Sequence, residues 1–129
     1  TTLFRSSGRG SLVSVASTMA VDVVKNYTHY GVAKAGIVGM VKGLARENAP
    51  VVRVNAVAPG LTNTAFLTGG TGREKVFEGI PEEVYAKRVP MKRMAQPADM
   101  AGPILFLLGG ASSFVNGEML IVDGGVYTQ

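Results

Sequence analysis

Three residues near the start of the chain, Ser17, Tyr30 and Lys34, have the types and the spacing to handle a proton on a substrate oxygen. If residues 28–48 form a helix, the step from Tyr30 to Lys34 stacks the phenol and the ammonium one turn apart on one face. A positive charge beside a phenol stabilises the phenolate, so we expect this tyrosine to exchange protons near neutral pH. The Ser17 hydroxyl would share the same substrate oxygen. This set suits the reduction of a carbonyl or the oxidation of an alcohol.

The Tyr30–Lys34 pair alone is weak evidence, because the same pair also occurs on solvated helix faces. The interpretation therefore depends on the predicted strand and helix that position these residues. Residues 11–16 (SLVSVA) form a short apolar run that predicts a buried strand, and Ser17 lies where that strand would end. Thr28 is placed to cap the amino end of the helix over residues 28–48.

A second apolar run over residues 51–58 (VVRVNAVA) predicts another buried strand, interrupted by Arg53 and Asn55 and ended by Pro59-Gly60. A strand, a long helix and a second strand make the βαβ pattern. Near-continuous apolar strands are typical of parallel sheets covered on both faces. We therefore expect a layered α/β domain.

The remaining segments fit the same scheme. Residues 97–108 predict a helix with Asp99 in its first turn, where the helix dipole favours a carboxylate. Residues 118–122 (EMLIV) predict a third strand. Between them, residues 61–90 contain several glycines and two short amphipathic stretches, at 74–78 and 81–88. We interpret residues 61–90 as a lid over a ligand crevice, with an ordinary surface excursion as the alternative.

Three glycines interrupt the long helix at Gly36, Gly39 and Gly43. Each glycine costs a helix roughly 1 kcal/mol relative to alanine, so three of them indicate close packing against a neighbour. That neighbour is either a second subunit or the sheet of the same chain.

Composition excludes several classes of function. The chain has 129 residues, 47% hydrophobic and 17% charged, with no cysteine and one histidine, His29, so we expect no disulfide and no metal site. The net charge is +4, but the basic residues are scattered and no aromatic residues interleave them, so we expect no nucleic-acid binding. No apolar run approaches the roughly 18 to 20 residues that cross a bilayer. We expect no membrane insertion and a cytoplasmic protein.

Taken together, the motifs resemble the carboxyl-terminal half of the short-chain dehydrogenase/reductase family, in its compact branch. The landmarks are Ser17, Tyr30 and Lys34, the run Arg53-Val54-Asn55-Ala56-Val57-Ala58-Pro59-Gly60, then Thr64, Pro97, Asp99 and Val122-Asp123-Gly124-Gly125. Their order and intervals agree with the family from about Gly10 onward. The extended relatives that act on nucleotide sugars share the Tyr/Lys pair, but the strand ending at Gly60 and the short tail fit the compact branch better.

The resemblance implies an α/β, Rossmann-type doubly wound parallel sheet and an NAD(P)-dependent oxidoreductase, with NAD or NADP as the cofactor. The substrate would be a small-molecule secondary alcohol or ketone. By resemblance, Tyr30 is the general acid or base and Ser17 orients the substrate oxygen. Lys34 favours the phenolate and binds the nicotinamide ribose hydroxyls.

The resemblance also assigns a cofactor-binding turn. Pro59 and Gly60 shape the backbone beside the nicotinamide, the backbone of Thr62 meets the carboxamide, and Thr64 adds a side-chain contact. Tyr30 and Lys34 complete the cofactor-binding set. Thr62 stands where relatives have an aliphatic residue, which a backbone contact tolerates.

One part of the family pattern is missing from residues 1–129. No glycine-rich fingerprint follows a strand and opens a helix, since Gly8 and Gly10 precede a strand. We interpret the sequence as the carboxyl-terminal half of one domain within a longer chain, rather than a cleaved or truncated product, and expect the isolated half to be inactive. A homo-oligomer, dimer or tetramer, is expected. The alternative function is a catalytically silent protein of the same fold that serves as a binding or scaffold protein.

Overall fold

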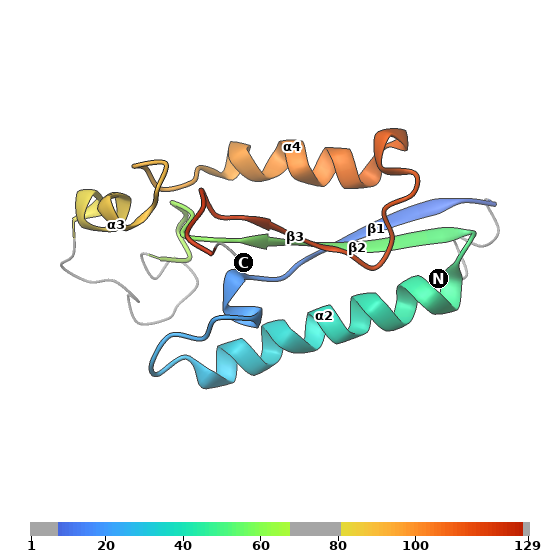
Figure 1. Ribbon diagram of the computed structural model, residues 1–129, viewed down its shortest axis with the longest axis horizontal. Helices are drawn as coiled ribbons and strands as arrows, with labels where there is room; N and C mark the ends of the chain where they lie inside the picture. The colour runs from blue at the N-terminus through green and yellow to red at the C-terminus, as the bar shows by residue number, and fades with distance from the viewer. Residues whose placement is uncertain (1–7, 68–80, 128–129) are drawn as a thin grey trace.

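The computed structural model of the protein describes residues 8–67 and 81–127. Within them the chain builds a three-layer arrangement, with a sheet between helix α2 on one side and helix α4 on the other (Figure 1). The elements in chain order are β1 (Gly10–Val15), the 3-10 helix η1 (Thr18–Ala20), α2 (Thr28–Asn48), β2 (Val52–Pro59), α3 (Glu82–Arg88), α4 (Pro97–Leu108), the 3-10 helix η2 (Gly110–Ser112) and β3 (Met119–Val122). None of the described helices has both the length and the apolar character needed to cross a bilayer.

The sheet has three strands in the order β1-β2-β3, and both pairings are parallel. Gly10 lies opposite Val52 in the first pair, and Ala56 lies opposite Met119 in the second. All three strands therefore end at the same edge of the sheet. The fold class predicted from the sequence, a Rossmann-type parallel sheet with helices on both faces, is confirmed.

The central strand β2 explains why its sequence is apolar almost throughout. Val54, Ala56 and Ala58 pack toward α2 in one buried cluster, whereas Val57 packs with Leu107 of α4 in the other. Successive side chains of a strand point to opposite faces, so a strand covered on both faces needs apolar residues at nearly every position.

Two polar residues of β2 point toward the segment that joins α4 to β3. Arg53 donates to the carbonyl of Gly109, at the carboxyl end of α4, over 3.0 Å. Asn55 is fully buried, donates to the carbonyl of Val115 over 3.0 Å and accepts from the N–H of Glu118 over 3.0 Å. The polar interruptions of the predicted strand thus hold the connection that leads into β3.

Two expectations about the long helix are corrected. Thr28 is the first helical residue rather than the cap; Tyr27 holds the cap position and makes no side-chain capping bond. Packing of the helix glycines on the chain's own sheet, one of the two alternatives, is also wrong for Gly36 and Gly39: apart from the nearby backbone of α2 itself, no described atom lies within 4 Å of a Cβ built there. That face of α2 is open.

The predicted lid is described only in part. Residues 68–80, which include the stretch at 74–78, lie outside the described residues. The second stretch forms α3, and residues 61–67 pass along the carboxyl edge of the sheet, where Thr62 bridges to Ala95.

Candidate active site

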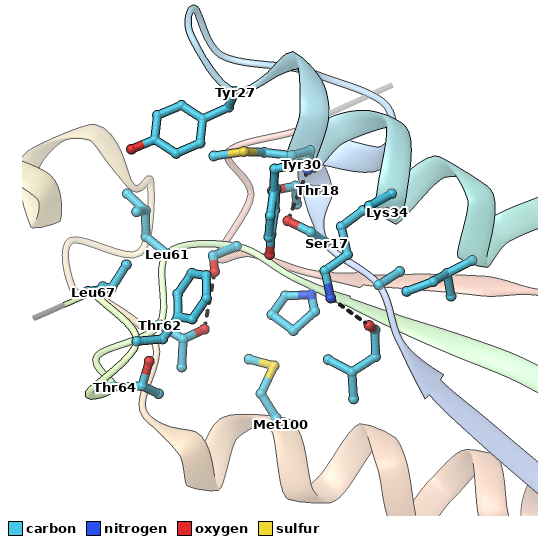
Figure 2. A pocket seen from close by; sticks show the side chains of 18 of the residues that line it. Ser17, Thr18, Tyr27, Tyr30, Lys34, Leu61, Thr62, Thr64, Leu67 and Met100 are labelled. Atoms are coloured by element: carbon cyan, nitrogen blue, oxygen red, sulfur yellow. Dashed lines mark hydrogen bonds between the residues drawn. The ribbon is translucent and has the colours of Figure 1, made fainter. Parts of the chain in front are cut away.

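A pocket of about 1140 Å³ opens at the edge where the parallel strands end. It is lined by residues that follow β1 and β2 and by the first turns of α2 and α4 (Figure 2). Ligands of parallel α/β sheets bind in this position, because the loops that leave the strands all meet there. The pocket brings together all seven site residues expected from the sequence: Ser17, Tyr30, Lys34, Pro59, Gly60, Thr62 and Thr64.

Ser17 is positioned by the end of β1. The N–H of Ala16 donates to the carbonyl of Val57 over 2.8 Å, which extends the pairing with β2 to the residue before the serine. Ser17 is extended, only 9% exposed, and caps the 3-10 helix η1: its Oγ accepts from the N–H of Met19 over 3.2 Å. This bond fixes the oxygen and leaves the hydroxyl proton for another acceptor.

Tyr30 and Lys34 lie one turn apart at the start of α2, as the spacing predicts. The ammonium of Lys34 lies 5.6 Å from the centroid of the Tyr30 ring and donates to the carbonyl of Val15, the last residue of β1, over 3.0 Å. Figure 2 shows the side chains of Ser17, Tyr30 and Lys34 converging on one side of the pocket. A cation is therefore close to the phenol, with a serine hydroxyl beside it.

Gly31 lets the loop after Ser17 pack against the helix. A Cβ at this position would lie 2.5 Å from Cγ2 of Val23 and 3.2 Å from the carbonyl of Met19. Because Gly31 has no side chain, the segment after Ser17 can pack directly against the start of α2.

The turn after β2 borders the other side of the pocket. The N–H of Gly60 donates to the carbonyl of Val122 over 3.0 Å, and the Thr62 hydroxyl donates to the carbonyl of Gly60 over 3.1 Å. Ala95 exchanges backbone bonds with the residues before and after Thr62. Because N–H groups alternate along extended backbone, the N–H of Thr62 points away from Ala95.

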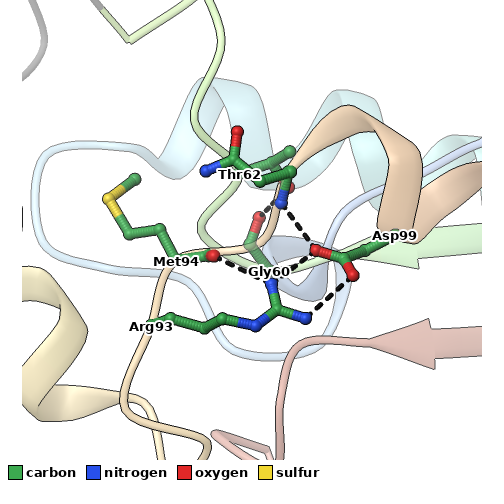
Figure 3. Close-up of polar contacts among 6 residues, drawn as sticks. Gly60, Thr62, Arg93, Met94 and Asp99 are labelled. Carbon is green, nitrogen blue, oxygen red and sulfur yellow. Dashed lines mark hydrogen bonds and ion pairs between the residues drawn. The ribbon is translucent and has the colours of Figure 1, made fainter.

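An ion pair fixes the segment that carries Ala95 (Figure 3). Arg93 donates two hydrogen bonds to Asp99, over 2.6 and 2.8 Å, and the N–H of Gln96 donates to the same carboxylate over 2.7 Å. The hydrogen bond from Arg93, followed by that from Gln96, lowers the pKa of Asp99 from 3.8 to about 2. Asp99 lies in the first turn of α4, as expected, and its carboxylate also binds Arg93, a pairing that was not predicted from the sequence.

Several pocket residues were not singled out in the sequence, although Phe66 and Leu67 lie within the predicted lid. Phe66 packs against the ring of Tyr30, with centroids 6.2 Å apart and a 40° angle between the planes. Met19, Tyr27, Leu67 and Met100 also line the cavity. Tyr27, Phe66 and Leu67 lie outside helices and strands and give no periodic signal, and the periodicity of α4 does not tell that Met100 faces the pocket, so only the path of the chain places these residues.

Comparison with known proteins agrees with this geometry. A family model described as Enoyl-(Acyl carrier protein) reductase matches residues 2–127. A short-chain dehydrogenase/reductase of Arabidopsis thaliana is 43% identical over 97 residues, covering 75% of this chain and 36% of its own length. A 3-oxoacyl-acyl-carrier-protein reductase of Thermotoga maritima is 37% identical over 121 residues, covering 91% of this chain and 45% of its own length.

Solved structures extend the likeness to the backbone. The gluconate 5-dehydrogenase of Burkholderia cenocepacia, crystallised with NADP and tartrate, superposes with a TM-score of 0.83 at 27% identity, covering 97% of this chain and 48% of that one. The chain thus spans about half the length, or less, of these relatives. The matched family model, the identities and the shared fold together place the chain in the short-chain dehydrogenase/reductase family.

Proposed function

We propose that the chain forms the catalytic part of an NAD(P)-dependent oxidoreductase that interconverts a secondary alcohol and a ketone. The observation that carries the proposal is the meeting of Ser17, Tyr30 and Lys34 in one pocket at the carboxyl edge of the sheet. Relatives named as reductases and dehydrogenases support the same reaction class. Because those relatives are about twice as long, we propose that the chain works as the carboxyl-terminal half of a longer protein.

In the direction of reduction, Tyr30 donates its phenolic proton to the carbonyl oxygen, and the resulting phenolate is stabilised by the ammonium of Lys34. Ser17 donates a second hydrogen bond to the same oxygen, because its own oxygen already accepts from the N–H of Met19. The nicotinamide, when bound, supplies the hydride to the carbonyl carbon. In oxidation the proton returns to Tyr30.

The residues of the pocket fit such a cofactor. An ammonium has three donors, and the carbonyl of Val15 takes one from Lys34, so the cation is oriented and can still bind ribose hydroxyls. The N–H of Thr62 points away from Ala95 and is placed for a carboxamide, with Thr64 beside it. We assign Pro59 and Gly60 to the turn that the nicotinamide contacts.

The test uses the full-length protein with NADH or NADPH and a panel of ketones. Tyr30→Phe should lower kcat by about 10²- to 10⁴-fold, the usual contribution of a general acid, while the dissociation constant of the cofactor stays nearly the same. Tyr127→Phe removes a hydroxyl that does not line the pocket and serves as the matched control. A Tyr30→Phe variant with near-normal kcat would remove the assignment.

The same assay separates the alternative, a catalytically silent binding or scaffold protein. That protein would bind the cofactor without turnover of any carbonyl, in wild type and variant alike. Residues 1–129 alone should be inactive, because the expected site for the adenosine and pyrophosphate lies in the other half of the domain.

We also propose that the protein is a homo-oligomer. The open glycine face of α2, at Gly36 and Gly39, is the surface that a second subunit would cover, since the glycines are not needed for packing inside the described chain.

A further inference from the structure

The walls of the pocket around the reacting groups are apolar. Met19 and Tyr27 precede the catalytic tyrosine, Leu61 and Phe66 follow β2, and Met100 comes from α4. Among the described lining residues there is no aspartate, glutamate, asparagine, glutamine or arginine. These are the side chains best able to satisfy several hydroxyl groups of one ligand at once.

Some of the polar groups that line the pocket already have partners within the protein. The Thr62 hydroxyl donates to the carbonyl of Gly60, and Lys34 is bonded to Val15. His29 is exposed and stacks on the ring of Tyr27, with centroids 6.4 Å apart. Ser17 and Tyr30 together offer hydrogen bonds to one substrate oxygen, and most of the remaining described wall is carbon, with single hydroxyls at Thr18, Tyr27 and Thr64.

Phe66 is an apolar group beside the tyrosine to which we assign the chemistry. Its centroid lies 6.2 Å from that of Tyr30, within the range of aromatic contacts, so a substituent on the reacting carbon meets both rings. Phe66 is 36% exposed and therefore has surface left to bury against a ligand.

These observations favour one class of substrate. We propose that the substrate is a ketone or secondary alcohol whose reacting carbon bears an apolar alkyl or aryl group packed against Phe66, rather than a polyhydroxylated chain. This inference rests on the proposed function. A hydroxyl buried without a partner is penalised, whereas each methylene removed from water is favourable by about 0.8 kcal/mol, a factor of about four in kcat/KM.

The experiment compares matched carbonyls in the full-length protein. The probes are butanone, 2-pentanone, 2-hexanone and acetophenone, with dihydroxyacetone and xylulose as polyhydroxylated ketones. We expect kcat/KM to rise about fourfold per methylene and to be lowest for the polyhydroxylated ketones. A flat series, or preference for xylulose over 2-pentanone, would overturn the inference and leave the proposed function intact.

Two variants test whether Phe66 produces the preference for apolar carbonyls. Phe66→Ala should lower kcat/KM for acetophenone roughly tenfold and change it little for butanone. Phe114→Ala removes a fully exposed ring outside the pocket and should leave both unchanged. If Phe66→Ala lowers every carbonyl equally, Phe66 does not select the substrate.

A binding measurement tests the apolar substrate site separately from the proposed oxidoreductase function. If no carbonyl is turned over, the proposed function fails. Thermal-shift titration of the same protein with 1-phenylethanol and with xylitol still tests the pocket: stabilisation by 1-phenylethanol that is lost in Phe66→Ala supports the apolar site. Stabilisation by xylitol alone, or by neither compound, contradicts it.

Discussion

Gly60 offers a direct test of the geometry beside the pocket. A Cβ atom added there would lie 2.6 Å from Cβ and 2.9 Å from Cα of Asp123. Ordinary carbon contacts are about 3.5 Å or longer, so Gly60→Ala must separate the two segments by roughly 1 Å. Both segments are held: Gly60 donates to Val122, and the Asp123 carboxylate accepts from the N–H groups of Gly125 and Tyr127.

The expected loss of stability follows from these contacts. Overpacking of a well-packed region costs about 1 to 3 kcal/mol, and loss of the hydrogen bond from Gly60 to Val122 adds about 1 kcal/mol. We expect Gly60→Ala to lower the free energy of unfolding by about 2 to 4 kcal/mol. In the full-length protein, at about 2 to 4 °C per kcal/mol, the melting temperature should fall by about 4 to 16 °C.

Urea and thermal unfolding, followed by circular dichroism, measure the change. Gly102→Ala is the matched control, because no described atom lies within 4 Å of a Cβ built there, inside α4. That variant should be more stable than wild type by about 0.5 to 1 kcal/mol, the helix propensity of alanine over glycine. If Gly60→Ala unfolds within about 0.5 kcal/mol of wild type, the inferred clash with Asp123 is wrong.

Three further predictions concern the rest of the fold. Asn55→Ala should lower the free energy of unfolding by about 2 to 4 kcal/mol in urea titrations, because the fully buried Asn55 side chain is lost and the N–H of Glu118 loses its partner; a neutral effect would contradict this role. Bonding lowers the pKa of Asp99 to about 2, so its stabilisation is complete above pH 3.8 and is lost as the pH falls toward 2. The difference in unfolding free energy between wild type and Asp99→Asn should shrink over that interval, and a constant difference would show that the pair with Arg93 does not act this way. Gly39→Leu should dissociate the oligomer in sedimentation experiments if the glycine face is the interface, whereas an unchanged sedimentation coefficient excludes that face.

The sequence predicted most elements because their signals are local. Both long helices have the predicted bounds, 28–48 and 97–108, since periodic apolar residues fill them and Pro50 or glycine follows. The first two strands are displaced by one residue and the third begins one residue later than predicted, because strand ends depend on pairing with neighbours rather than on side-chain type.

The site was predictable only where spacing along the chain carries the chemistry. Tyr30 and Lys34 lie on one helix, so their separation in sequence fixes their separation in space. Phe66 reaches Tyr30 through the path of a loop, and Arg93 reaches Asp99 across the start of α4, which no local pattern encodes. The glycines of α2 left two neighbours open; the chain's own sheet is not the neighbour at Gly36 or Gly39, and a second subunit stays a prediction.

Lys34 and Ser17, the two polar residues beside Tyr30, are both held by main-chain atoms. Lys34 bonds to the carbonyl of Val15, and Ser17 accepts from the N–H of Met19. A substitution at position 15 or 19 changes a side chain but keeps those atoms. If the proposed function holds, substrate recognition can change through the side chains of Met19 and Phe66 while the contacts that orient Ser17 and Lys34 stay the same.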